Sequence, residues 1–258
     1  MPLLHRGRPL KRWRYIAVFN DELMACAANV QVGPAKQSFW ALYTRGDRQL
    51  RERTRLLPRR GLLELTPGRL RLNDGNVSLE LDFAEDAGIE ARCPNGRAWV
   101  WTRKQAGVHA HGTLSLDGGA KRPIEALAVI DETAGYHARV TEWRWAAGVG
   151  VDPEGTPLAF NLVEGVNDPP NGSERAIWVA GLPREVPPVS FAADLTAVTA
   201  ADGSELRFTP EAERRRRENM LIVRSEYRAP FGVFSGTLPG GVQLTHGLGV
   251  MEHHRARW

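Results

Sequence analysis

The sequence predicts an all-β protein made of two antiparallel β-barrel or β-sandwich halves that pack together. Short runs rich in β-branched and aromatic residues recur along the 258 residues, and tight turn signals separate them. The sequence lacks the helix-periodic stretches that connect parallel strands, and it lacks the G-x-G-x-x-G, P-loop and G-x-S-x-G motifs. Nucleotide-cofactor and serine-hydrolase folds are therefore not expected.

In the first half, we expect strands at 13–19, 23–32, 38–44, 77–83 and 98–102. The turn sequences between such runs are Asn-Asp-Gly at 73–75, Pro-Asn-Gly at 94–96 and Asp-Gly-Gly at 117–119. These residues tolerate positive φ and suit tight hairpins, which join antiparallel strands.

In the second half, we expect strands near 138–147, 157–164, 175–180, 187–192, 204–208, 219–227, 232–238 and 242–258. Many short strands at this spacing indicate barrels or sandwiches. A polar, glycine-containing turn at 131–136 follows the apolar run 124–130. We therefore expect an N-terminal β-domain at 1–130 and a C-terminal β-domain at 131–258.

Composition points to a cytoplasmic protein without a transmembrane segment. No run of 18 apolar residues occurs, and the basic residues 1–14 lack the apolar core and cleavage site of a signal peptide. Cys26 and Cys93 lie far apart without C-x-x-C spacing, which predicts two plain thiols.

The basic residues do not predict a nucleic-acid partner. The net charge is +4, and the clusters at 6–14, 45–60 and 214–217 occur without a recognisable docking element or interleaved aromatic residues. The last cluster is flanked by glutamates, which predicts a solvated turn or one short helical turn. The oligomeric state is left open.

Candidate site residues gather at the start of the second half. Asp131, Glu132 and His137 are candidate proton donors and acceptors in the turn that precedes a strand. Trp143 and Trp145 point to one face of that strand because side chains alternate. They either line a pocket for a flat or polyene-like apolar molecule or fill a barrel interior.

Further candidates for ligand binding are Asn161, Glu174 and Trp178. Asn161 faces opposite Phe160 and Leu162 in an otherwise apolar run. A buried amide or acid needs hydrogen-bond partners, so Asn161 either orients a ligand or stabilises the barrel mouth.

The final strand carries an unusual acid and imidazole. Alternation places Glu252 and His254 on the face that also bears Val250, Ala256 and Trp258. If this face points inward, the two groups are buried, lie close enough to hydrogen-bond, and can share a proton near neutral pH. The alternative is a structural pair that closes the barrel.

Histidine spacing gives little support to a metal site. A site built from His254, His137 and a carboxylate has no supporting ligand spacing. His109 and His111 stand between glycines and indicate an exposed hairpin, although an H-x-H pair is compatible with a metal. We expect no metal and no cofactor.

Several motifs occur together in a fixed order along the chain. They are Lys11-Arg12-Trp13-Arg14-Tyr15, Trp143-x-Trp145-x-x-Gly148, Asn161-Leu162 before Asn167-Asp168, Ser173-Glu174 before Trp178, Leu206-x-Phe208, Phe231-Gly232-x-Phe234-x-Gly236 and Glu252-x-His254-x-x-x-Trp258. Their combination resembles the bacterial domain of unknown function 2804 family over nearly the whole chain.

A more distant resemblance concerns the Asp131-x-x-x-Gly135 turn, Trp143-x-Trp145 and a turn at Gly155. These features are similar to the carotenoid hydratase and lipocalin-like cyclase superfamily. The resemblance implies two packed lipocalin-like barrels with a pocket that protonates or folds polyenes. Hydratases carry D-H-x-W-G at that turn, whereas Glu132 and Ala134 replace the His and Trp here. A carboxyl at 132 could still donate a proton, but hydratase activity is not implied.

Three functions are compatible with these patterns. The favoured one is a cofactor-independent lyase or isomerase for a hydrophobic small molecule, with Glu252 and His254 as acid and base and a carboxyl pKa raised by burial. The second is a non-catalytic carrier or sensor of a lipid or isoprenoid, which needs the same kind of pocket. The third is a structural or interaction protein with a filled core.

Overall fold

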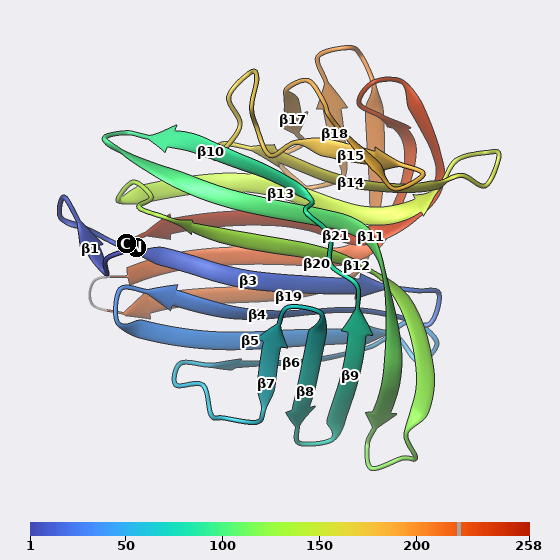
Figure 1. Ribbon diagram of the computed structural model, residues 1–258. Helices are drawn as coiled ribbons and strands as arrows, with labels where there is room; N and C mark the ends of the chain where they lie inside the picture. Colours follow the sequence, from blue (N-terminus) through green and yellow to red (C-terminus); the bar gives the residue numbers. More distant parts are fainter. Residues whose placement is uncertain (221–222) are drawn as a thin grey trace.

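The structure is a computed structural model that describes residues 1–220 and 223–258, and it is built from strands joined by turns and loops (Figure 1). The prediction of an all-β antiparallel fold is confirmed. Within the described residues, no helix has the length and apolar character needed to cross a membrane.

Three sheets contain all the strands of residues 1–220 and 223–258. A small sheet pairs β1 (Leu4–His5) with β2 (Arg8–Pro9). The first large sheet consists of β3 (Lys11–Phe19), β4 (Leu23–Val32), β5 (Ala35–Thr44), β6 (Gln49–Arg55), β7 (Leu63–Thr66), β8 (Arg69–Asp74), β9 (Val77–Phe83), β10 (Ile89–Asn95), β11 (Ala98–Leu116) and β12 (Arg122–Gly135). The second consists of β13 (Val140–Val151), β14 (Pro157–Glu164), β15 (Ala176–Val179), β16 (Leu182–Glu185), β17 (Val189–Phe191), β18 (Ala197–Ala200), β19 (Glu205–Met220), β20 (Val223–Leu238) and β21 (Val242–Arg257).

The first large sheet bends sharply at β11. Its strand order is β6-β5-β4-β3-β12-β11-β9-β8-β7, and β10 pairs with the early part of β11 while β9 pairs with the late part. Gly107 lies at the bend with φ +77°, inside a bulge between Ala106 and Val108. A side chain is strained at this φ, so glycine permits the change of direction.

Strand β3 explains why this half of the sequence has continuous apolar runs instead of simple alternation. Tyr15 and Ala17 face a core between the two large sheets, whereas Ile16 and Val18 face a second core beneath the first sheet. Because β3 is covered on both faces, successive positions are all apolar.

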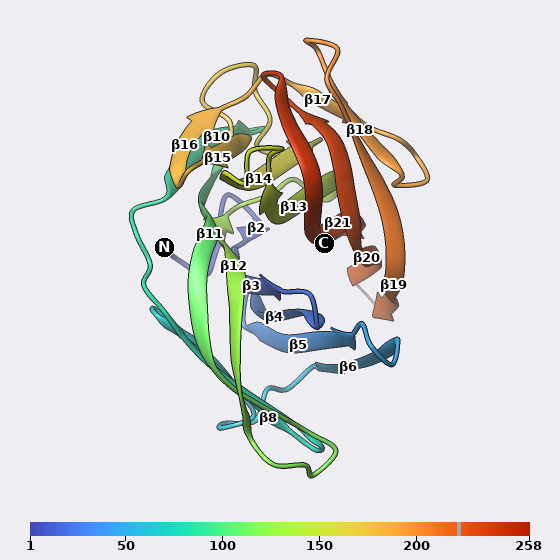
Figure 2. The ribbon, with the colours of Figure 1, turned by 90° about the vertical axis from the view of Figure 1, so that its right-hand side faces the viewer.

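The second large sheet has the order β16-β15-β14-β13-β21-β20-β19-β18-β17. Its inner face packs on the first sheet, and its outer face covers a third core that includes Phe160, Phe208 and Phe234. Figure 2 shows the blue strands β3 to β6 facing β13 and the orange and red strands β19 to β21 across the middle of the molecule. Residues from both halves of the sequence therefore form one central core.

The chain passes from the first sheet to the second between Gly135 and Val140. Strand β12 extends to Gly135, so the expected turn at 131–136 is mostly strand. The division into domains at 130 and 131 stays a prediction, and the change of sheet falls a few residues later.

The prediction of a solvated turn or one short helical turn at the last basic cluster was wrong. Arg214 to Arg217 lie inside the sixteen-residue strand β19, because pairing with β20 continues through the whole basic run. His109 and His111 are exposed, as expected, and lie in the middle of β11, which forms an antiparallel hairpin with β12; the turn of this hairpin follows Leu116 and is not at the glycines beside the histidines. Of the strand predicted at 219–227, residues 221 and 222 lie outside the described residues.

At the edge opposite the β12–β13 connection, side chains join the two large sheets. Arg45 after β5 forms two hydrogen bonds of 2.8 and 2.9 Å with the carboxylate of Glu211 in β19. Arg214 in β19 donates a hydrogen bond of 2.7 Å to the hydroxyl of Thr54 in β6. The space between the sheets is thus bounded on both sides.

Candidate functional site

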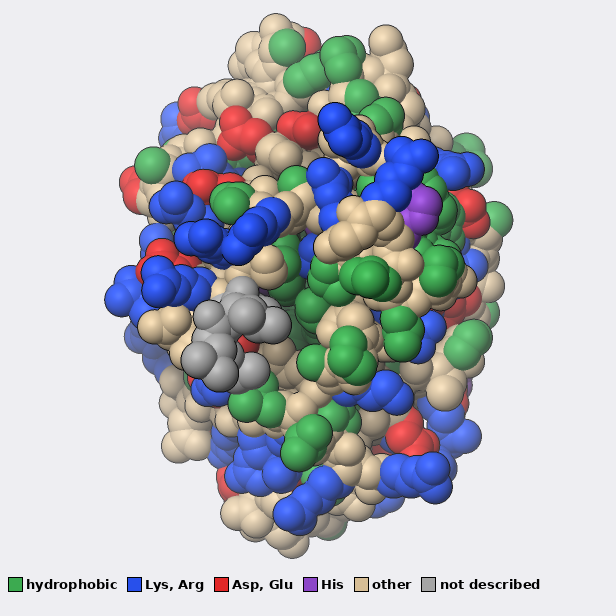
Figure 3. Space-filling view, turned by 90° about the vertical axis from the view of Figure 1, so that its left-hand side faces the viewer, with side chains coloured by type: hydrophobic (Ala, Val, Ile, Leu, Met, Phe, Trp, Pro, Cys, Tyr) green, Lys and Arg blue, Asp and Glu red, His purple; other side chains and the backbone are tan. Residues whose placement is uncertain are grey.

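A cavity of about 220 Å³ lies between the two large sheets. The first sheet contributes Trp13, Tyr15, Phe39, Lys104 and Asp131 to its wall, and the second contributes Trp143, Trp145, Tyr227, Glu252 and His254. One end approaches the surface near Lys36 and Glu218. Figure 3 shows this face of the molecule, with hydrophobic side chains around a hollow near its centre.

Aromatic rings form much of the cavity wall. Trp13 and Trp143 come from opposite sheets and stack with centroids 6.3 Å apart and an interplanar angle of 11°. Tyr15 meets Trp145 edge to face at 5.5 Å. Such walls favour flat apolar molecules and stabilise positive charge at a ring face.

Glu252 is a buried carboxyl in this aromatic wall. Its Oε1 accepts a hydrogen bond of 2.8 Å from the indole Nε1 of Trp143. Burial raises the pKa of Glu252 to about 7, against the opposing effects of Trp143 and of the nearby Tyr227 hydroxyl. The Tyr227 hydroxyl lies outside ordinary hydrogen-bond geometry, so we count Trp143 as the only direct donor among the described residues. Glu252 is therefore a group that holds a proton near neutral pH.

His254 has partners other than Glu252. Its Nε2 lies 2.7 Å from the hydroxyl of Ser225, and its ring centroid lies 4.4 Å from that of Trp143. Burial, with the positive charges of His253 and Arg214, lowers the pKa of His254 to about 3. Both side chains line the cavity as expected, but the prediction of a hydrogen bond between them was wrong for the described residues. The reason is that Trp143, opposite His254 in the neighbouring strand, occupies the space beside Glu252.

His137 also lines the cavity and is 1% exposed. Neither ring nitrogen has a hydrogen-bond partner among the described residues, and the ring centroid lies 5.2 Å from that of Trp13. Burial lowers the pKa of His137 to about 3, and the charge of Lys11 adds to this effect. His137 is therefore a neutral imidazole that can donate one hydrogen bond and accept another.

Asp131 belongs to a buried ionic cluster that the sequence did not predict. Its carboxylate lies 2.6 Å from Nζ of Lys104 and accepts a hydrogen bond of 3.0 Å from the indole of Trp13. The same ammonium lies 3.3 Å from Glu174, which in turn accepts a hydrogen bond of 3.0 Å from Asn167. Lys104 comes from the first sheet and Glu174 from the second half of the chain, so the cluster ties the two together.

The charges of this cluster depend on one another. Burial opposes the charged form of Lys104, but Asp131 and Glu174 outweigh burial and raise its pKa. For Glu174, burial raises the pKa. The charge of Lys104 opposes this rise, and the charge of Asp131 adds to it. A single ammonium is thus shared by two adjacent carboxyl groups.

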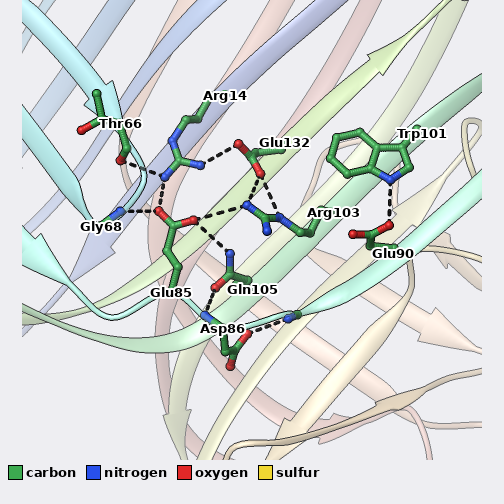
Figure 4. A network of polar contacts seen from close by, with 11 residues as sticks. Arg14, Thr66, Gly68, Glu85, Asp86, Glu90, Trp101, Arg103, Gln105 and Glu132 are labelled. Carbon is green, nitrogen blue, oxygen red and sulfur yellow. Dashed lines mark hydrogen bonds and ion pairs between the residues drawn. The ribbon is translucent and has the colours of Figure 1, made fainter.

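Glu132 lies on the other face of β12 and outside the cavity wall. It pairs with Arg14 and Arg103, and Arg14 and Arg103 also contact Glu85, as Figure 4 shows. This ion-pair network fastens the loop after β9 to the sheet. Strand alternation separates Glu132 from Asp131, so this residue does not share a site with the cavity groups.

Asn161 and Trp178 pack around the cavity wall without lining the cavity. The side chain of Asn161 accepts a hydrogen bond of 2.7 Å from Trp145 and donates one of 2.8 Å to the backbone carbonyl of Glu174. Its polar atoms are used in holding Trp145 in place. Trp178 is part of the central core.

Several residues of the cavity wall escaped sequence reasoning, namely Trp13, Tyr15, Lys104, Arg214 and Tyr227. The one candidate signal is the use of lysine, since only four lysines occur beside thirty arginines. Two of the four, Lys11 and Lys104, prove to be buried, with exposures of 1% and 2%. The other two, Lys36 and Lys121, are exposed, so lysine identity alone does not separate buried from exposed charges.

The raised pKa of Glu252 predicts a pH dependence of stability. Between pH 4.5, the ordinary value of the carboxyl, and about pH 7, the folded protein keeps a proton that the unfolded chain releases. Stabilisation from this group is complete below pH 4.5 and is lost as pH rises to about 7, by roughly 3 kcal/mol in total. Urea unfolding of the wild type and of Glu252→Gln across this range should show the wild type losing stability relative to the variant. Curves that stay parallel would contradict the raised pKa.

The family comparison matches residues 74–258 to a domain of unknown function, DUF2804. No curated protein matches. A solved structure named as a candidate AttH from Nitrosomonas europaea is similar at a TM-score of 0.61 and 13% identity, over 97% of this chain and 93% of that one.

Two further solved structures share the fold. Kievitone hydratase from Nectria haematococca is similar at a TM-score of 0.57 and 11% identity, over 94% of this chain and 88% of that one. CghA, solved with Sch210972, is similar at a TM-score of 0.52 and 8% identity, over 96% of this chain and 88% of that one. At these identities the likeness shows the fold alone. The family match covers more than half of the chain, and the protein belongs to the DUF2804 family, a domain of unknown function.

Proposed function

We propose that this protein is a cofactor-independent enzyme that transfers a proton to a hydrophobic small molecule held in the central cavity. The reaction class is isomerisation, hydration or cyclisation. The observation that carries the proposal is Glu252, a buried carboxyl with a pKa of about 7 in an aromatic cavity wall. A general acid works best when its pKa lies near the working pH.

A single carboxyl is sufficient for such a cycle. Protonated Glu252 donates its proton to a carbon–carbon double bond, which leaves a carbocation on the substrate and a carboxylate on the enzyme. Loss of a proton from the substrate back to Glu252 gives an isomer or a cyclised product, whereas attack by water gives a hydrated product and returns one proton. The faces of Trp13, Trp143 and Trp145 are suited to stabilise the cation.

The other cavity groups have supporting roles. Trp143 holds the carboxyl of Glu252 through its indole N–H. Asn161 fixes Trp145, and the ionic cluster of Lys104 fixes the wall on the opposite side. The presence of a named hydratase among proteins of the same fold is compatible with this chemistry.

Native mass spectrometry of protein purified from its own host tests whether the cavity holds a ligand. We expect a small apolar compound to copurify and to emerge with altered structure after incubation with the enzyme. Ala28 lines the cavity, so Ala28→Leu should reduce the retained compound by filling space. Its circular dichroism spectrum serves as the control for folding.

Two outcomes would contradict the enzyme proposal. A compound that is retained but never altered indicates the carrier or sensor function. Absence of any compound from the wild type, together with no binding of added apolar molecules, indicates that the aromatic groups only fill the interior.

A further inference from the structure

We infer that the ligand of the central cavity is an uncharged, oxygenated ring compound, recognised through several hydrogen bonds, and not a plain hydrocarbon. This inference rests on the proposed function of the cavity and names its substrate class. Four buried uncharged side chains in the wall carry polar atoms without a hydrogen-bond partner among the described residues, in addition to Nε of the charged Arg214. They are Tyr15, His137, Asn167 and Tyr227.

These four side chains are well shielded from solvent. Their exposures are 5% for Tyr15, 1% for His137, 7% for Asn167 and 8% for Tyr227. A buried polar group without a partner destabilises the folded protein, and such groups are rare in native structures. Four around one cavity indicate that a ligand with complementary polar groups supplies the partners.

The chemistry of the unpaired atoms defines what the ligand must present. Burial raises the pKa of Tyr15 and of Tyr227 well above the ordinary range, so both phenols keep their O–H at neutral pH. The amide nitrogen of Asn167 is already used by Glu174, which leaves its carbonyl oxygen as an acceptor. Carbonyl or ether oxygens suit the tyrosine donors, and a ligand hydroxyl suits the acceptor at Asn167.

The spacing of these groups favours a rigid ring body. Tyr15 and Tyr227 both lie beside Phe39, with centroid distances of 6.5 and 6.1 Å. His137 instead packs on Trp13, whose other neighbour is Trp143. Polar contacts are thus divided between two regions of the wall with aromatic faces between them. A flat ring system with oxygen substituents at more than one position matches this division.

Charge and size restrict the class further. The ammonium of Lys104 is shared by Asp131 and Glu174. The other buried cation of the wall, Arg214, donates a hydrogen bond to Thr54 and lies 3.5 Å from the carboxylate of Glu52. The imidazoles of His137 and His254 are neutral. An ionised ligand would therefore lack a free counter-charge in this part of the wall. The volume of about 220 Å³ lies below the ~300–1,000 Å³ of sites that enclose drug-sized ligands, which favours compounds with about two fused rings.

The test compares two probes of equal ring size, 2-naphthol and naphthalene, in equilibrium binding by intrinsic fluorescence. Naphthalene is the more hydrophobic of the two, so simple partitioning favours it. We expect the wild type to bind 2-naphthol about 10-fold more tightly, because one recovered hydrogen bond has an effect of this size. The double variant Tyr15→Phe and Tyr227→Phe should lose the preference while still binding naphthalene.

Tyr43→Phe is the matched control, since Tyr43 is a buried tyrosine of the central core outside the cavity wall. It should keep the preference, and thermal melting of each variant checks folding. The inference is overturned if the wild type binds naphthalene as tightly as 2-naphthol or more tightly. It is also overturned if the double variant keeps the preference for 2-naphthol. In both cases the cavity still binds a ligand, so the proposed function is not affected. Binding of neither probe counts against the proposed function as well.

Discussion

Replacing Glu252 with glutamine is expected to lower turnover of the compound identified by mass spectrometry by about 100- to 10,000-fold, the usual contribution of a general acid. Glutamine has nearly the same shape and can still accept the hydrogen bond from Trp143, but it has no proton to transfer. Binding should therefore change little, and the loss should appear in kcat. Steady-state kinetics and a separate binding measurement distinguish the two effects.

Glu142→Gln provides the control for this variant. Glu142 lies on β13 beside Trp143 but points to the opposite face, where it hydrogen-bonds His253 at 2.9 Å. Turnover by this variant should equal that of the wild type. If Glu252→Gln also retained wild-type turnover, Glu252 would not be the proton donor and the proposed mechanism would fail.

The second large effect concerns stability. Lys104→Met should lower the free energy of unfolding by about 3–5 kcal/mol, because it leaves the buried carboxyl groups of Asp131 and Glu174 without their shared cation. The loss should shrink as the solution is acidified, since protonated carboxyls no longer need a counter-charge. Urea unfolding at pH 7 and pH 4 measures both parts of this prediction.

Two comparisons isolate the cause. Lys121→Met removes an exposed ammonium paired with Glu80 at 2.8 Å and should cost less than about 1 kcal/mol. The triple variant Lys104→Met, Asp131→Asn and Glu174→Gln removes all three charges and should recover much of the lost stability. A loss at Lys104 no larger than that at Lys121 would show that the cluster contributes little.

Strand alternation accounts for most of what the sequence predicted correctly. The period of two in the last strand places Glu252 on the same face as Val250 and Ala256, and this face does point into the molecule. The same reasoning paired Trp143 with Trp145 on the cavity face of β13. These predictions needed only local backbone geometry, which the sequence specifies through its apolar pattern.

Predictions that depended on strand ends or on neighbours were less successful. The run at 214–217 was expected to be a turn, but strand pairing with β20 overrides the local preference of a charged run, and Arg214 becomes buried against Phe39 and Tyr227. Asp131 and Glu132 were grouped as one site because the end of β12 was placed too early. Extending the strand by a few residues puts them on opposite faces.

By itself, the sequence determined the β class, the antiparallel pairing and the face on which Glu252 and His254 lie, because each follows from turn residues and a two-residue period. Only the tertiary structure decided which side chains meet in the cavity. The register between β13 and β21 brings Trp143 to Glu252, and the packing of the two sheets brings Lys104 to Glu174. Contacts of this kind join residues far apart in the chain, and their geometry is set by sheet curvature and packing, which no local pattern encodes.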